Sequence, residues 1–294
     1  MKTSSKITKV GIIGAGQMGS GIAHVCAQFG FDVLLYDIAK EVIDNSLIGI
    51  EKQAKRLHEK QRITKKDYKA ICSNILKSTN LEDFSDRELI IEAATEDEEI
   101  KKSIFKTLLP IIHHSTILAT NTSSISITRL AAATDRPQAF IGVHFMNPVP
   151  VMKLVEIIKG ITTDDVTYQT IIDFISRLDR TAVTSQDFPA FIVNRILVPM
   201  LNEAMFVLYE GIGNVNDIDQ AMKLGANHPM GPLELADFIG LDTCLSIMQV
   251  IFNGSGDSKY RPCPLLVNYV EAGWLGRKSG KGFYEYSQKA PIPS

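Results

Sequence analysis

Short apolar runs alternate with amphipathic stretches along the chain up to about residue 185. Each run has the length and composition of a buried strand, and each stretch between them has helical periodicity. This alternation predicts a mostly parallel sheet with helices on both faces. The expected strands are 10–13, 31–36, 89–93, 116–120, 139–144, 153–158 and 181–184, and the expected helices are 17–29, 98–112, 127–133 and 165–178.

The segment 38–74 interrupts this rhythm because it is polar and periodic over a longer distance. The pattern predicts a pair of helices with a break near 61–64, where Thr64 is suited to cap the second helix.

From Pro189 onward the pattern is helical, and no stretch reads as a strand. The change at 185–189 predicts a domain boundary, which gives domains at 1–186 and 187–294. Several helices of the second domain are apolar, as expected for a thick core or a subunit interface. The expected helices of this domain are 190–209, 215–224, 232–239, 242–252 and 264–272.

A glycine-rich turn follows the first strand, with Gly14, Gly16 and Gly19 in the spacing G-x-G-x-x-G. Gly14 permits the tight turn, Gly16 lets the backbone approach a pyrophosphate, and Gly19 lets the helix pack on the strand. The helix that begins at Gln17 and Met18 then presents its positive end to phosphates. The sequence therefore predicts an α/β fold of the Rossmann type, which binds a dinucleotide and is followed by an all-helical domain.

Asp37 ends the next strand, where a carboxylate accepts hydrogen bonds from the hydroxyl groups of the adenosine ribose. No arginine follows directly to hold a 2′-phosphate, so the sequence favours NAD over NADP.

Composition excludes several classes of partner. The 294 residues are 45% hydrophobic and carry a formal net charge of −2, which gives no field that attracts nucleic acid or an anionic membrane. The four cysteines lack the spacing of a metal or redox motif, and we expect them to be reduced and buried. The first six residues contain no apolar leader, and no run is long enough to span a membrane. We therefore expect a soluble, unprocessed cytoplasmic protein.

Glu156 stands in the middle of the apolar segment 154–158, where a carboxylate needs a partner. His144 ends the preceding strand, and the short link 145–152 would hold the two strands close. We expect both residues to lie at the carboxyl ends of strands, beside the dinucleotide. An imidazole that is held by a carboxylate on one nitrogen is suited to act as a general base. The alternative is a glutamate in water at a sheet edge and a core histidine bonded to the backbone.

Other polar residues are weaker candidates. Asn121, Ser123 and Asn147 follow strands, so they are either turn formers or ligand-binding groups at the carboxyl edge of the sheet. Asn194 interrupts an apolar helix, and its buried amide could bind a substrate oxygen.

The helical pair is rich in lysine and arginine, including Lys60 and Arg62. It is either a solvated face or a site for a phosphorylated carrier. The loop 276–284 is either a turn or a route by which Lys281 reaches a cofactor. His113 and His114 lack further ligands at a suitable spacing, so no metal site is predicted.

Taken in order, six segments resemble the 3-hydroxyacyl-CoA dehydrogenase family, and most of all its short bacterial 3-hydroxybutyryl-CoA members. The resemblance covers nearly the whole chain. Phe188-Pro189-Ala190-Phe191 departs from it, since Ala190 stands where the family has glycine. The segments are GAGQMG, NTSSISIT, HFMNPVPVMKLVEII, FIVNR, DIDQAMKLGANHPMGPLEL and GWLGRKSGKGFYEY.

The resemblance implies reversible, NAD-linked oxidation of an (S)-3-hydroxyacyl-CoA to a 3-oxoacyl-CoA. His144 would be the base, Glu156 its orienting partner, and Ser123 and Asn194 would contact the reacting oxygen. The family further implies a CoA contact from the basic helical pair and a homodimer through the helical domain. It also implies that NAD is held by Glu96, Lys101, Ser123, Asn147 and Lys281.

Two other readings stay open. The chain could be a sister dehydrogenase of a free hydroxy acid or sugar acid, which would not need the basic helical pair. It could also be a structural or regulatory protein that binds NAD without catalysis.

Overall fold

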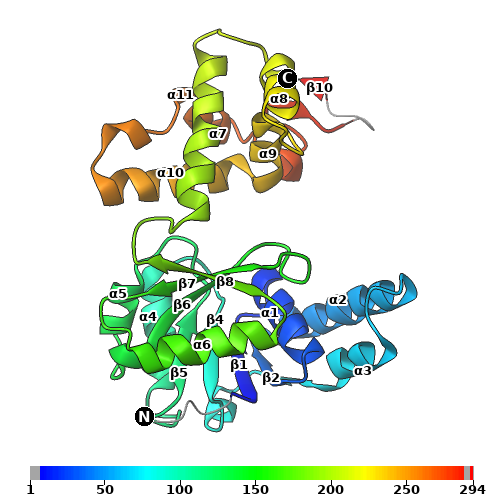
Figure 1. Cartoon of the computed structure of the whole chain (residues 1–294), viewed down its shortest axis with the longest axis vertical. Coiled ribbons are helices and arrows are strands. Elements are labelled where there is room, and N and C mark those ends of the chain that lie inside the picture. The colour runs from blue at the N-terminus through cyan, green and yellow to red at the C-terminus, as the bar shows by residue number, and fades with distance from the viewer. Residues whose placement is uncertain (1–6, 288–291, 294) are drawn as a thin grey trace. The chain divides into compact units, whose positions relative to one another are not determined.

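The structure is a computed structural model that describes residues 7–287 and 292–293 (Figure 1). The chain divides into two compact units, Met1–Phe188 and Pro189–Ser294, which are described separately below. Residues 1–6, where the sequence shows no apolar leader, lie outside the described residues.

The first unit is built on an eight-stranded sheet in the order β3-β2-β1-β4-β5-β6-β7-β8. The first six positions in this order have the arrangement of a dinucleotide-binding fold. β7 pairs antiparallel with β6 and parallel with β8, so these last two strands run opposite to the rest. The mostly parallel sheet predicted from the sequence is confirmed. Its strands are β1 (Lys9–Ile13), β2 (Asp32–Tyr36), β3 (Ile75–Ser78), β4 (Leu89–Glu92), β5 (Ile117–Thr120), β6 (Phe140–Phe145), β7 (Leu154–Lys159) and β8 (Thr181–Gln186).

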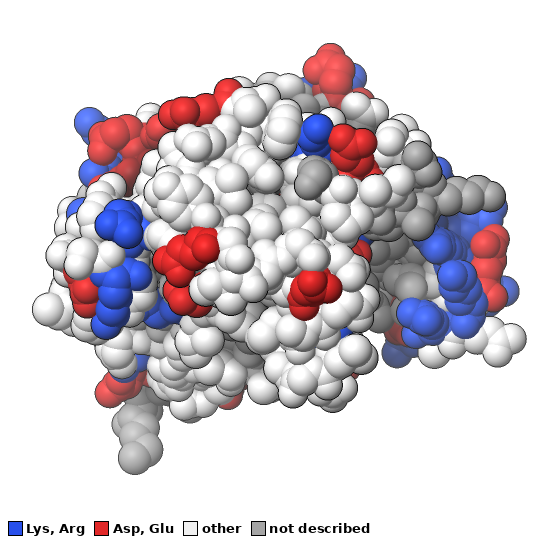
Figure 2. All heavy atoms as spheres, turned by 90° about the horizontal axis from the view of Figure 1, so that it is seen from above, with Lys and Arg blue, Asp and Glu red and all other residues white. Residues whose placement is uncertain are grey.

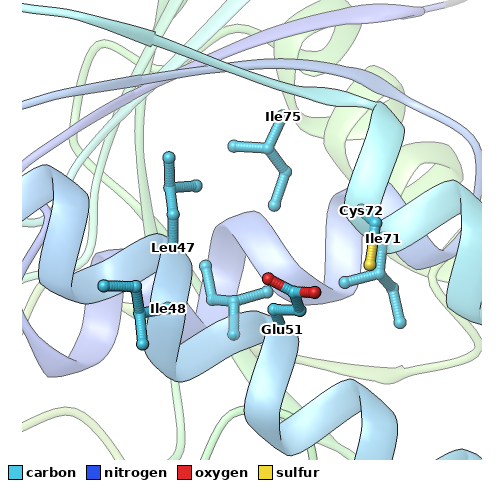
Figure 3. A pocket seen from close by; sticks show the side chains of 7 residues that line it. Leu47, Ile48, Glu51, Ile71, Cys72 and Ile75 are labelled. Carbon is cyan, nitrogen blue, oxygen red and sulfur yellow. The ribbon is translucent and has the colours of Figure 1, made fainter.

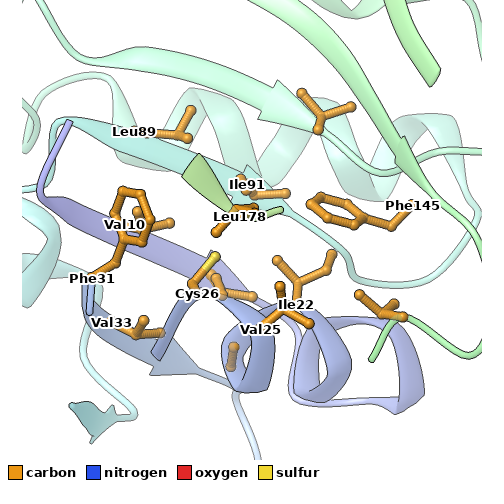
Figure 4. Packing of buried hydrophobic residues seen from close by; sticks show 14 of the residues in the cluster. Val10, Ile22, Val25, Cys26, Phe31, Val33, Leu89, Ile91, Phe145 and Leu178 are labelled. Carbon is orange, nitrogen blue, oxygen red and sulfur yellow. The ribbon is translucent and has the colours of Figure 1, made fainter. Parts of the chain in front are cut away.

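Alternate residues of these strands form one large core with α1 (Gln17–Gln28) and α6 (Asp165–Arg177). Figure 4 shows Val10, Val33 and Ile91 from the sheet against Ile22 of α1. Burial of these side chains is the main stabilising term for this layer, at roughly 25 cal/mol per Å² of apolar surface.

The opposite face of the sheet is covered by α4 (Glu98–Leu108) and α5 (Ile127–Ala132). Phe105 of α4 packs edge-on against Phe140 of β6, with ring centroids 4.9 Å apart. Gly142 leaves room for Ile127 of α5, because a Cβ there would lie 2.8 Å from that side chain. His144 and Glu156 point to this same face, since their strand neighbours Val143 and Ile157 belong to the core on the other one.

The predicted helical pair is α2 (Lys40–Glu59) and α3 (Lys65–Ser73). Thr64 caps α3 as expected: its hydroxyl accepts the Asp67 N–H at 3.1 Å, and the Asp67 carboxylate accepts the Thr64 N–H at 2.9 Å. The sequence analysis missed β3, which follows α3 directly. This strand is short and lies at the sheet edge, so it lacks the apolar pattern of the inner strands.

The second unit is mainly helical, as predicted, but the expectation of no strand was wrong. Tyr284–Glu285 (β9) and Ile292–Pro293 (β10) form a small antiparallel pair. The helix expected from residue 190 begins at Val193, because Ala190 and Phe191 have φ angles of 65° and 56°. Its helices are α7 (Val193–Tyr209), α8 (Val215–Gly225), α9 (Pro232–Ile239), α10 (Leu241–Ser255) and α11 (Pro264–Glu271).

All four cysteines are free thiols. Cys26, Cys244 and Cys263 are buried as expected, but Cys72 on α3 is exposed, which corrects the prediction for that residue. Across residues 7–287 and 292–293, no single helix has the length and apolar character to cross a membrane; α9 and α10 meet that test only as a pair, bent by 96°.

Candidate active site

The glycine turn lies at the carboxyl end of β1. Gly14 has φ = 97°, a conformation that glycine adopts without strain, and a Cβ at Gly19 would lie 1.8 Å from the Gly14 carbonyl oxygen. A Cβ at Gly16 would meet nothing within 4 Å, so the backbone there faces open space. Gly16 caps α1 without any side-chain hydrogen bond, which leaves the first amide groups of the helix to a ligand.

A cavity of about 620 Å³ opens beside this turn. It lies where the strand order reverses, between the carboxyl ends of β1 and β4, which is the ligand position in such sheets. Asp37 forms part of its wall, and its carboxylate accepts the Ala15 N–H at 2.9 Å. The mixture of amide donors, one carboxylate and apolar walls fits a dinucleotide. The cavity is lined by Ile13, Gly14, Gly16, Gln17, Met18, Tyr36, Asp37, Ile38, Val42, Leu81, Ala93, Ala94, Thr95, Ile100 and Ile104.

His144 and Glu156 are directly opposite each other in the β6–β7 ladder. The distance between His144 Nδ1 and Glu156 Oε2 is 2.8 Å. Glu156 is 0% exposed and the His144 side chain is 9% exposed. Since an ionised carboxylate only accepts hydrogen bonds, this contact assigns the proton to Nδ1.

One part of the sequence interpretation needs correction. It placed both residues at the carboxyl ends of strands, and this holds only for His144. Because β7 runs in the opposite direction, Glu156 lies within its strand and reaches the histidine by register instead.

Two asparagines connect this region to the glycine turn. The Asn121 side chain accepts the Phe145 N–H at 2.9 Å, next to His144. The Asn147 side chain accepts a hydrogen bond from Gln17 at 3.2 Å, so the loop after β6 contacts the first residue of α1. These polar residues are therefore parts of one arrangement around the carboxyl edge of the sheet.

Glu96 binds the loop that carries Ser123. Its Oε1 atom accepts the Ser123 N–H at 2.8 Å and the Ser123 hydroxyl at 3.2 Å. Burial opposes ionisation of this carboxyl, but the Lys101 ammonium and hydrogen bonds from the loop outweigh it and lower the pKa of Glu96.

Lys101 lies in the protein interior, and its side chain is 1% exposed. Its ammonium donates to both oxygens of Glu92, at 2.7 and 2.8 Å, and lies 3.5 Å from Glu96 Oε2. The sequence analysis missed Glu92. The one signal was a carboxylate at the end of the apolar run 89–92, a position where an ordinary turn residue is also common.

The acidic run at residues 97–99 has a structural use. Asp97 caps α4 by accepting the Ile100 N–H at 2.9 Å. Glu98 binds Arg129 at 2.8 Å, and Glu99 binds Lys102 at the same distance. Acidic groups at a helix N-terminus are favourable because they meet its positive end.

Asn194 and Lys281 belong to the second unit. Asn194 lies in α7, as predicted, but in its first turn and only half-buried, so the expectation that its amide is buried was wrong. Lys281 binds Glu285 at 2.9 Å, and its ammonium lies 4.1 Å from the centroid of the Trp274 ring.

The basic residues of the helical pair are exposed, and Figure 2 shows blue side chains gathered at the edge of the molecule where α2 and α3 lie. A small cavity of about 180 Å³ lies on this pair, between apolar side chains and the Glu51 carboxylate (Figure 3). None of the residues that line this small cavity lines the large one. The exposed basic residues are Lys52, Lys55, Arg56, Lys60, Arg62, Lys65, Lys66 and Lys69.

Within the described ranges, no three histidine, cysteine, aspartate or glutamate side chains are grouped so that they could hold a metal ion.

Comparison with known proteins identifies the family. Residues 9–188 match the model of the 3-hydroxyacyl-CoA dehydrogenase NAD binding domain, and residues 191–286 match that of the C-terminal domain of this family. The chain is 58% identical over 288 residues to a 3-hydroxybutyryl-CoA dehydrogenase of Bradyrhizobium diazoefficiens, with 98% of each chain covered. It is 52% identical to a probable 3-hydroxybutyryl-CoA dehydrogenase of Bacillus subtilis, covering 97% of this chain and 99% of the relative.

Solved structures agree. The crystal structure of (S)-3-hydroxybutyryl-CoA dehydrogenase from Ralstonia eutropha superimposes with a TM-score of 0.93 at 46% identity, covering 96% of this chain and 100% of the other. The glycine turn, the cavity beside it and the matches over both units lead to one conclusion: the chain belongs to the 3-hydroxyacyl-CoA dehydrogenase family and is an NAD-dependent oxidoreductase.

Proposed function

We propose that the protein interconverts (S)-3-hydroxybutyryl-CoA and acetoacetyl-CoA, with His144 as the general base. The observation that carries the proposal is the hydrogen bond between His144 Nδ1 and the fully buried Glu156 carboxylate. The names of the similar proteins support the choice of a four-carbon substrate.

The mechanism follows from the movement of charge. Bound NAD supplies the hydride acceptor. His144 Nε2 takes the proton of the substrate hydroxyl, and the imidazole becomes positively charged. Glu156 stabilises that charge across the 2.8 Å contact, so its effect grows toward the transition state.

Hydrogen-bond donors serve the reverse reaction. Ser123 lies within the loop between β5 and α5, and by the family resemblance both its hydroxyl and Asn194 contact the substrate oxygen. A donor on a ketone oxygen polarises the carbonyl and favours hydride addition to the carbon.

Some of the groups proposed to hold NAD line the large cavity. The α1 N-terminus would receive the pyrophosphate, and Asp37 would accept the ribose hydroxyl groups. Lys101 is buried between Glu92 and Glu96, so we propose that it supports the cofactor site through Glu96. Lys281 stays a prediction from the resemblance.

The deciding experiment is NADH oxidation with acetoacetyl-CoA, with longer 3-oxoacyl-CoA esters and with free acetoacetate. We expect the highest kcat/KM with acetoacetyl-CoA and little turnover of the free acid. A preference for the free acid would favour the sister dehydrogenase instead. Binding of NADH without turnover of any ketone would favour a non-catalytic NAD-binding protein.

The basic helical pair is the proposed contact for CoA. Lys60 and Arg62 are exposed near the α2–α3 turn, where phosphate groups could approach. Replacing both with glutamine should raise KM for acetoacetyl-CoA several-fold and change KM for NADH less, and the effect should shrink as salt screens it. Replacing Lys106 with glutamine removes an exposed charge elsewhere in this unit and serves as the control. If the control raised KM for acetoacetyl-CoA as much as the Lys60 and Arg62 replacements do, the helical pair would be only a solvated face.

We also propose a cytoplasmic homodimer that forms through the second unit. Large apolar side chains are exposed on its helices and loops, namely Ile196, Ile212, Leu224 and Phe238. Figure 2 shows a face with few charged side chains in its middle. Light scattering should give twice the chain mass, and substitution of Leu224 with arginine tests whether this surface is involved.

A further inference from the structure

Glu92 is a buried carboxylate that the proposed reaction does not use. It ends β4, is 0% exposed, and accepts the Ala94 N–H at 2.7 Å. It also accepts the Thr120 hydroxyl at 2.7 Å and two hydrogen bonds from Lys101. A carboxylate has about four acceptor positions, so this group is saturated.

Lys101 reaches Glu92 from α4, the helix that follows the β4–α4 loop. A buried ammonium is costly unless its protons are bound, and two of them are directed to Glu92. Glu96 Oε2 lies 3.5 Å away on another side of the ammonium. Lys101 therefore lies between two carboxylates and connects them.

Glu96 connects the lysine to the substrate loop. Its Oε2 atom faces Lys101, whereas its Oε1 atom binds the loop after β5. Thr122 and Ser124 donate their hydroxyl groups to that oxygen at 2.6 and 3.0 Å, and Ser123 donates both its amide and its hydroxyl. The position of Ser123 thus depends on where Lys101 holds Glu96.

We propose that Glu92 is a positioning residue for catalysis, which acts on Ser123 through Lys101 and Glu96. Without the Glu92 charge, Lys101 would be attracted more strongly to Glu96 than to residue 92 and would draw Glu96 away from the serine loop, because buried hydrogen bonds in a network depend on one another. The inference rests on the proposed function, in which Ser123 contacts the reacting oxygen.

The main variant is Glu92→Gln, which keeps the size of the side chain and removes its charge. We expect kcat for acetoacetyl-CoA reduction to fall on the order of tenfold or more, as displaced substrate contacts do. KM for acetoacetyl-CoA should change by no more than about threefold, whereas the Kd of NADH should rise, because Glu96 and Lys101 also support the proposed cofactor site. A purely structural defect would instead lower the amount of folded enzyme and leave kcat per folded molecule unchanged.

A second variant keeps the test decisive if Glu92→Gln does not fold. Thr120→Val removes one donor from Glu92 and leaves every charge in place. Thr120 also accepts the Thr122 N–H at 3.3 Å, and the substitution removes this hydrogen bond as well. The measurement is therefore made at the next residue, Ser123. The matched control is Thr116→Val: Thr116 is buried just before β5 and donates its hydroxyl to the Arg87 carbonyl at 2.8 Å.

The readout is the exchange rate of the Ser123 amide proton, measured by NMR on protein labelled with ¹⁵N-serine. This amide donates to Glu96, so it reports the last step of the connection. We expect exchange on the order of tenfold faster in Glu92→Gln and Thr120→Val, and unchanged in Thr116→Val.

The outcomes separate this inference from the proposed function. The wild-type rate with acetoacetyl-CoA tests the function alone, whereas the amide measurement needs no substrate. Unchanged Ser123 exchange in the folded Glu92 variant, or in the Thr120 variant if that one alone folds, would overturn the positioning role. So would equal losses of kcat in Thr120→Val and Thr116→Val.

Discussion

Glu92 and Glu156 are two carboxylates of one sheet that are both 0% exposed, yet they have different kinds of partner. Glu156 lies 2.8 Å from an imidazole, and Glu92 lies 2.7 Å from an ammonium. A histidine gains and loses its proton near neutral pH, whereas a lysine that is bound to a carboxylate stays charged. The first pair is thus suited to a charge that appears during the reaction, and the second to a charge that is always present.

The two carboxylates also differ in what their removal would leave behind. Loss of the Glu156 charge leaves a histidine that can stay neutral. Loss of either charge from the Glu92–Lys101 pair leaves a buried ion that has lost part of its stabilisation. The comparison therefore predicts that changes at β6–β7 lower the rate with little loss of stability, whereas removal of a charge at β4–α4 lowers stability in addition to displacing the serine loop.

Lys101→Met should produce the largest effect on stability, because it leaves the Glu92 charge buried without its ammonium partner. Removing one partner of a buried ion pair costs about 3–5 kcal/mol of stability. Urea unfolding at pH 7 should show this loss in the midpoint, with Lys102→Met on the exposed side of α4 as the control. A midpoint close to that of the wild type would mean that Glu92 does not need a charged partner for stability, which would contradict the comparison.

His144→Gln should follow, with a fall in kcat on the order of a hundredfold, since a missing general base costs that much. Its NADH affinity and unfolding midpoint should stay close to those of the wild type, because the imidazole acts on the substrate proton. Steady-state rates and NADH fluorescence titration check both parts. An unchanged turnover number would show that His144 is not the general base.

Glu156→Gln should have a somewhat smaller effect on the rate, on the order of tenfold or more. The amide keeps a hydrogen bond to His144 but does not offset the developing imidazolium. The acidic limb of the oxidation rate against pH should therefore move to lower pH, and the fold should survive. A slower enzyme with an unmoved limb would show that Glu156 acts on something other than the charge of His144.

Asp37→Ser should have the smallest effect of the four and sharpens the comparison with a third carboxylate. Asp37 is partly exposed at the large cavity and accepts backbone amides from Ala15 and Ala39. We expect NADH to bind roughly fivefold more weakly and the gap to NADPH to narrow, since hydrogen bonds to charged groups contribute about 1.5–3 kcal/mol before other groups compensate. A wild-type preference for NADPH would contradict this role.

The sequence predicted one of the two buried carboxylates, and the reason is local. Glu156 interrupts an apolar run, and its partner lies only one strand earlier. Glu92 ends such a run, where polar residues are common, and its contact with Lys101 depends on how α4 packs against the sheet. Side-chain pairs of this kind need the tertiary structure before they can be seen.

The same reasoning applies to the fold. The inner strands and most helices follow from hydrophobic periodicity, whereas the edge strand β3 has two exposed residues out of four and gives no such pattern. The reversed direction of β7 could not be read from its composition, because a strand buried on both faces looks the same in either direction. The start of α7 was predicted too early because Ala190 has φ = 65°, which is not a helical conformation. Residues other than glycine rarely adopt this φ, so nothing in the sequence indicated it.

The antiparallel pairing of β6 and β7 has a consequence for the order of folding. His144 and Glu156 are 12 residues apart and meet across a hairpin, so their contact closes only a short loop. Thr120 and Glu92 are 28 residues apart and meet only when parallel neighbours assemble. Short-range contacts cost less chain entropy to form, so we expect the β6–β7 hairpin to be structured early and the Glu92 network late. Mutations in the hairpin should then slow refolding, and mutations around Glu92 should mainly speed unfolding.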